Sequence, residues 1–248
     1  MITEFPLLVF TVLTGLAAGA YVAAAAFPPK EQAKNAVLFP VICLVLAAVG
    51  SVASVLHVGR PALVFGIFAN PTSSLTLEAI FAGLFCIGII VDLVMAAMKK
   101  SNRAVSIVVA VLGVALLLVQ AHAYATSYGV AAWCSPAIWP FVLLSAVAAG
   151  FPLAGCFGAA QGGKTPSLAA CVLLVLGGLC AVIEAVIFNG AAADGVMVIA
   201  LGAVIMFVAA ACAFMAKDEK ATMVYATAVL AIVALFVMRY GFYMASII

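Results

Sequence analysis

A chain of 248 residues that is 69% hydrophobic and only 7% charged cannot bury its apolar side chains inside a water-soluble fold of this size. Its solvent is therefore predicted to be lipid, and a net charge of +2 is too small to indicate a nucleic-acid partner. The seven cysteines form no CxxC pattern. We interpret them as small buried side chains and expect no metal site.

Eight stretches of the chain are long and apolar enough to cross a bilayer as helices, which takes roughly 20 residues each. In chain order they are 5–26, 37–57, 75–98, 104–125, 137–160, 167–188, 195–215 and 221–245. Prolines, glycines and charges between them end each helix. Because the connections are short, we predict an all-α polytopic membrane protein: one eight-helix bundle in a single domain, 1–248.

The basic residues predict how this bundle is oriented. Eight of the ten lysines and arginines fall on one side of the predicted membrane: Lys30, Lys34, Lys99, Lys100, Arg103, Lys164, Lys217 and Lys220. The positive-inside rule assigns that side to the cytoplasm. Both termini are therefore expected on the extracytoplasmic side.

Most ionisable residues in or near the spans are predicted to lie near the extracytoplasmic surface. They are His57, Arg60, Glu78, His122, Glu184 and Arg239. Ionisable side chains in lipid cost roughly 2.5–3.5 kcal/mol each, so a group at one depth predicts shared partners inside the bundle. Asp92 alone lies toward the cytoplasm, where a lysine or a proton would neutralise it. His122 is explained as an interfacial residue and Glu184 as a residue close enough to water to ionise, so the roles of these three residues stay open.

His57 and Glu78 are the strongest candidates for chemistry, because they flank one short extracytoplasmic connection. A quinol must release two protons when its electrons leave. Histidine titrates near neutrality and accepts a proton readily, and a carboxylate takes the second proton or passes it to water. An arginine would anchor a carbonyl oxygen of the ring or keep the carboxylate charged. The chain shows no haem, flavin or iron–sulfur signature, so the electrons are expected to leave to a partner protein.

The stretch LHVGRPALVFGIFANPTSSLTLE resembles a motif of the form LHLGxPxRA…SxLSxE in the membrane-anchor subunit of dimethyl sulfoxide reductase, the DmsC family. The matching positions are Leu56, His57, Gly59, Pro61, Ser73, Leu75 and Glu78. The last span carries RYGFY, similar to the arginine and aromatic residues of that family. In one departure from the pattern, Arg60 precedes the proline, whereas the family places an arginine after it.

The resemblance implies a respiratory complex in the bacterial inner membrane. Such anchors oxidise menaquinol near the outer face and hold no haem or iron–sulfur cluster themselves. Electrons pass to an extracytoplasmic partner with four [4Fe-4S] clusters and then to a molybdopterin catalytic subunit. In this family the motif's histidine and glutamate serve the quinol site, and these correspond to His57 and Glu78. Arg60 and Arg239 are the further candidate contacts to the quinol.

Two other functions fit parts of the sequence. A secondary transporter would place polar groups near the bilayer midplane at a repeat interface, whereas here they gather at one boundary and no repeat is visible. A b-type haem protein would use His57 and His122 as ligands, because both lie toward the extracytoplasmic side.

Overall fold

The computed structural model describes residues 4–28, 36–57, 61–157, 164–188, 193–218 and 221–244. The long helices in this part of the chain are α1 (Phe5–Ala26), α2 (Leu38–His57), α3 (Ser74–Ala97), α4 (Arg103–Ala125), α5 (Ile138–Cys156), α6 (Lys164–Phe188), α7 (Ala193–Met215) and α8 (Ala221–Met244). Short 3₁₀ helices are η1 (Pro61–Ala69), η2 (Ala131–Trp133) and η3 (Ala216–Asp218). All eight long helices are apolar enough to span a bilayer, which confirms the predicted all-α membrane fold.

The helix boundaries differ from the predicted ones mainly in the second half of the chain. Helix α5 ends at Cys156, four residues before the predicted end, and α6 begins at Lys164, three residues before the predicted start. Pro166 therefore lies inside the first turn of α6. Proline is tolerated there because the first N–H groups of a helix have no intrahelical partner. The helix η1 was not predicted from the sequence.

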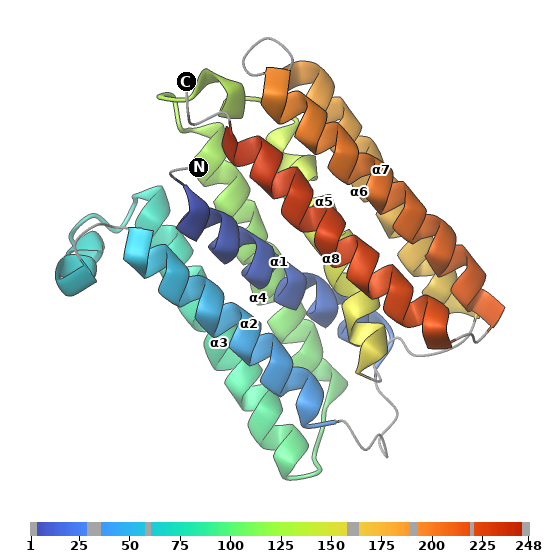
Figure 1. Cartoon of the computed structure of the whole chain (residues 1–248). Helices are drawn as coiled ribbons and strands as arrows, with labels where there is room; N and C mark the ends of the chain where they lie inside the picture. Colours follow the sequence, from blue (N-terminus) through green and yellow to red (C-terminus); the bar gives the residue numbers. More distant parts are fainter. Residues whose placement is uncertain are drawn as a thin grey trace.

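Helices α1 and α5 form the centre of the bundle. In their most apolar 18-residue stretches, 78% of α1 and 72% of α5 are buried, against 28–39% in the other six. Helix α1 packs against α2, α4, α5 and α8, and α5 packs against α1, α4, α6 and α8 (Figure 1). The outer helices present many valines, leucines and isoleucines on their exposed faces, as expected for contact with lipid.

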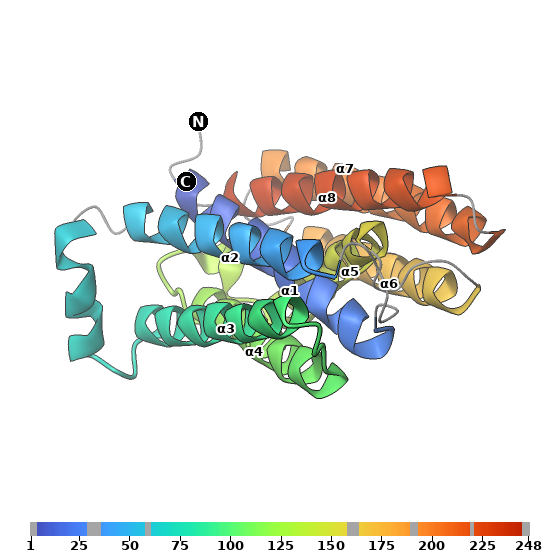
Figure 2. The same cartoon turned by 90° about the horizontal axis from the view of Figure 1, so that it is seen from below.

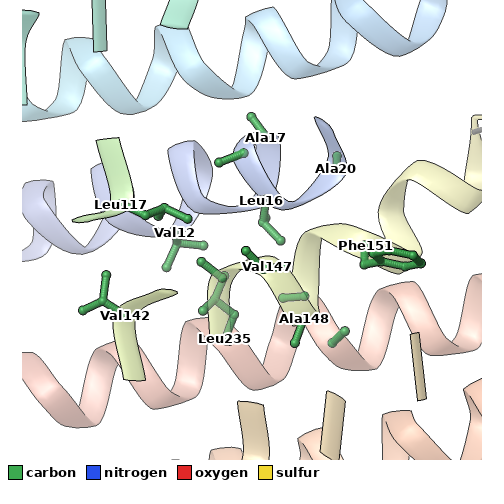
Figure 3. Close-up of a cluster of buried hydrophobic side chains, with 14 of the residues drawn as sticks. Val12, Leu16, Ala17, Ala20, Leu117, Val142, Val147, Ala148, Phe151 and Leu235 are labelled. Carbon is green, nitrogen blue, oxygen red and sulfur yellow. The ribbon is translucent and has the colours of Figure 1, made fainter. Parts of the chain in front are cut away.

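Small residues allow α1 and α5 to approach closely. A Cβ atom added to Gly19 would lie 2.6 Å from the carbonyl oxygen of Ala146, and one added to Gly150 would overlap the backbone of α1 at Leu16. Glycine at such positions lets two helix backbones touch in a membrane. In Figure 3, Val12 and Leu16 of α1 lie near Val147 of α5. We call this contact the α1–α5 interface.

The helices α1 to α8 make an even number of spans. The start of α1 and the end of α8 therefore lie at the same end of the bundle (Figure 1). We call it the terminal end, and we call the opposite end, where Lys99, Lys100 and Arg103 lie, the basic end. Helix η1 lies at the terminal end, beyond the last turn of α2 and the first turn of α3 (Figure 2).

A threonine side chain fastens η1 to α3. The hydroxyl oxygen of Thr76 lies 2.6 Å from the carbonyl oxygen of Ile67 and 2.8 Å from that of Asn70. Ser73 caps α3, and its side-chain oxygen accepts a hydrogen bond from the Thr76 amide at 3.2 Å. The N-terminal cap of α3 therefore also holds the preceding 3₁₀ segment in place.

Candidate functional site

A cavity of about 240 Å³ lies toward the terminal end of the bundle, between α1, α2, α3 and η1. Its lining is mostly apolar, and its polar side chains are Ser51, Ser54, Glu78 and Cys86. For comparison, a dry engineered cavity of about 150 Å³ binds benzene. The space therefore suits an aromatic ring with a few substituents, and an apolar wall with a few polar groups is typical of small-molecule sites.

Glu78 is the acidic residue among the described residues that line this cavity. Its side chain is 7% exposed, and no hydrogen-bond donor or cation contacts its carboxyl group within the described part of the chain. The carboxyl group lies within electrostatic range of the hydroxyl groups of Tyr124 and Tyr243. A buried carboxyl group without a direct partner is costly to stability. Such a position favours a group that exchanges a proton or contacts a ligand.

His57 lies at the end of α2, one turn after Ser54, which lines the cavity. Its Nε2 atom is 3.2 Å from Oε2 of Glu4, the residue directly before α1. The ring N–H is not aligned on that oxygen, so the contact is an ion pair by distance and not an aligned hydrogen bond. His57 does not line the cavity, and the structure brings it to Glu4 and not directly to Glu78.

The structure places only one of the two candidate arginines, Arg60 and Arg239. Arg60 lies outside the described residues. Arg239 is buried in α8 at 1% exposure and does not line the cavity. Its Nη2 donates a hydrogen bond to the carbonyl oxygen of Val142 at 2.9 Å, and its guanidinium group lies 5.0 Å from the centre of the Phe141 ring. A direct contact between Arg239 and a quinol in this cavity therefore stays an untested prediction.

Glu184, whose role the sequence left open, is fully buried in α6 and interacts electrostatically with Arg239. Both of its carboxyl oxygens, and Nε and Nη1 of Arg239, lack hydrogen-bond partners in the described part of the chain. The two groups therefore interact electrostatically without direct contact. This pair links α6 with α8 in the region around α5, which packs against α1, α6 and α8 and which we call the packed side of the molecule.

A cluster of aromatic side chains lies at the terminal end, near Glu184 and Arg239. The Tyr124 and Tyr243 hydroxyl groups share a hydrogen bond, and the Tyr243 hydroxyl lies 3.2 Å from that of Thr11. Trp133 stacks on Phe242, with ring centres 5.2 Å apart, and its indole N–H donates to the Phe242 carbonyl at 3.1 Å. Helices α1, α4 and α8 are thereby linked by polar contacts between otherwise apolar surfaces.

The remaining polar candidates lie in separate places. Asp92 accepts a hydrogen bond from the Tyr21 hydroxyl at 3.0 Å, near the basic end. It borders a second cavity of about 220 Å³ that Arg103 also lines. His122 is on α4 and packs beside Trp139 of α5, with ring centres 5.8 Å apart. His57 and His122 thus contact different elements, which does not favour one haem held between them.

Glu4 is the residue that sequence reasoning missed. Two signals could have identified it. It is an acidic residue directly before the first span in a chain with only eight acidic residues. In addition, two consecutive antiparallel spans place the start of the first and the end of the second at the same membrane surface. Glu4 and His57 must therefore lie at that surface together.

Among the described residues, no group of three or more histidine, cysteine, aspartate or glutamate side chains is arranged to hold a metal ion.

A family model described as the DMSO reductase anchor subunit (DmsC) matches residues 1–246, nearly the whole chain. No curated protein sequence matches the chain.

Proposed function

The chain belongs to the DMSO reductase anchor subunit family and is the membrane anchor of a DMSO reductase-type complex, and from this premise we propose that it oxidises menaquinol in the cavity beside Glu78. The observation that carries the proposal is the position of a buried carboxyl group, which has no direct partner among the described residues, in an apolar space of about 240 Å³ at the terminal end.

The proposed reaction separates protons from electrons. Menaquinol becomes menaquinone by losing two protons and two electrons. His57, at the end of α2, accepts one proton, and Glu78 accepts the other. The electrons leave to a docked partner subunit with four [4Fe-4S] clusters, which passes them to a molybdopterin catalytic subunit. The headgroup lies between Glu78 and the serine side chains of α2, while its isoprenoid tail extends into lipid.

The proposed orientation follows from the positive-inside rule. Lys99, Lys100 and Arg103 at the basic end support placing that end in the cytoplasm of a bacterial inner membrane. The terminal end, with the cavity and both termini, then faces the extracytoplasmic side. A partner subunit docked there would receive electrons close to where the quinol releases them.

The proposal is tested with His57→Gln and Glu78→Gln in the complete membrane-bound complex. Both variants should reduce quinol-linked turnover by at least about tenfold, while turnover with an artificial soluble donor is retained, because that donor bypasses the membrane site. His122→Gln is a matched control: it changes the same side chain at the same end of the bundle, but away from the cavity.

Wild-type quinol turnover in both the His57 and the Glu78 variants would refute the assignment. A reduced-minus-oxidised optical spectrum of the isolated subunit tests the haem alternative separately. A b-type band in that spectrum would replace the haem-free anchor with a haem-containing one.

A further inference from the structure

The contact between Glu4 and His57 differs from an ordinary surface ion pair. The two side chains are 22% and 36% exposed, and the pair joins the start of α1 to the end of α2. Glu4 Oε2 is itself buried and has no aligned donor in the described part of the chain. Such an oxygen needs a hydrogen-bond donor. The Nε2 atom of His57 lies 3.2 Å away and can supply the donor when the ring turns its N–H toward this oxygen.

The pair lies close to the cavity on both of its helices. Ser54 and Val55 of α2 line the cavity and precede His57 by three and two residues. Phe10 of α1 also lines it and follows Glu4 by six residues. The first turns of α1 and the last turn of α2 therefore contribute both to the cavity wall and to the ion pair.

We propose that Glu4 is a positioning residue for His57, a role that rests on the proposed oxidation of quinol. The Glu4 carboxylate accepts the Nε2–H of the imidazole and thereby fixes the ring orientation and the tautomer. This leaves Nδ1 without a proton and able to accept one. A carboxylate that binds one ring nitrogen of a histidine commonly determines the tautomer and the role of the other.

The proton transfer is balanced within this arrangement. One O–H bond of the quinol breaks and an N–H bond forms at Nδ1 of His57, with the proton passing through one bridging water because His57 lies one turn beyond Ser54 of the cavity wall. The quinol's electrons go to the iron–sulfur partner, and Glu78 receives the second proton. The imidazole gains a positive charge at this step, and the negative charge of Glu4 at 3.2 Å compensates it.

The test compares Glu4→Gln, His57→Gln and the double variant in the complete complex, with quinol and with an artificial soluble donor. Glu4→Gln should lower kcat with quinol by about tenfold and leave KM within about twofold, because Glu4 orients the base and does not bind the headgroup. The double variant should be no slower than His57→Gln alone, because the two side chains act as one unit. Turnover with the artificial donor should be unchanged and reports assembly.

Glu4→Asp keeps the charge on a shorter side chain and should give a kcat between those of the wild type and Glu4→Gln. If the Glu4→Gln complex fails to assemble, Glu4→Asp replaces it in the test. Unchanged quinol turnover in Glu4→Asp would then contradict the positioning role of Glu4. Normal quinol turnover in Glu4→Gln, or losses that simply add in the double variant, would overturn it as well. If His57→Gln itself keeps normal quinol turnover, the proposed function fails first, and the two failures are thereby distinguished.

Discussion

The packed side and the cavity side of this bundle use the same residue types in opposite ways. On the packed side, Gly150 brings α5 against α1, and buried Glu184 has a compensating arginine. On the cavity side, a Cβ atom added to Gly83 would meet nothing within 4 Å, and buried Glu78 has no direct partner in the described part of the chain. The missing side chain of a glycine either allows two helices to pack closely or leaves space for a ligand. A buried carboxyl group likewise either compensates a charge or stays available for chemistry.

The largest effect is expected from comparing the two carboxyl groups by substitution with leucine. Glu184→Leu should lower the free energy of unfolding by about 2–3 kcal/mol, because buried Arg239 loses its electrostatic interaction with Glu184. Glu78→Leu should leave stability unchanged or raise it, because it removes a buried polar group without a direct partner. Thermal unfolding of the purified complex in detergent measures both changes.

The double variant Glu184→Leu/Arg239→Leu is the control for this comparison. It should be more stable than Glu184→Leu alone, because no uncompensated charge then remains in the packed side. Equal losses of stability for Glu184→Leu and Glu78→Leu would mean that the two carboxyl groups do not differ as the structure indicates.

The next effect concerns the α1–α5 interface. Gly150→Val should destabilise the protein by about 1–3 kcal/mol or prevent its assembly, because the added side chain meets the backbone of α1. Gly83→Val adds the same atoms where there is open space and should change stability little. The yield and the unfolding temperature of the two variants, prepared in parallel, test the contrast. An unaffected Gly150→Val protein would contradict the close approach of α1 and α5.

The smallest effect is expected in the cavity and concerns affinity instead of stability. Gly83→Leu should raise the KM for quinol by about tenfold, or about 1.4 kcal/mol, because a larger side chain occupies part of the cavity. Turnover with an artificial soluble donor should be unchanged. If Gly83→Leu leaves quinol kinetics at wild-type values, the quinol does not bind in this space.

Part of the candidate site could be predicted from the sequence, because hydropathy and charge are local properties. They placed His57 and Glu78 at one membrane surface without any knowledge of helix packing. Sequence did not pair His57 with Glu4, because Glu4 lies 53 positions earlier and the contact depends on which face α2 turns toward α1. Nor did it show that Arg239 lies outside the cavity lining, since that depends on the rotation of α8 about its own axis.

By itself, the sequence determined the class of protein, its eight spans and the end of the bundle where most of its polar groups gather. Its apolar runs had no stable alternative to helices in lipid, where every backbone N–H and C=O must be paired within the segment. Only the tertiary structure distinguished Glu78 from Glu184. Each is a lone glutamate in an apolar span near the terminal end. One lines a cavity and the other interacts electrostatically with an arginine, because side-chain surroundings are set by neighbouring helices and not by the local sequence.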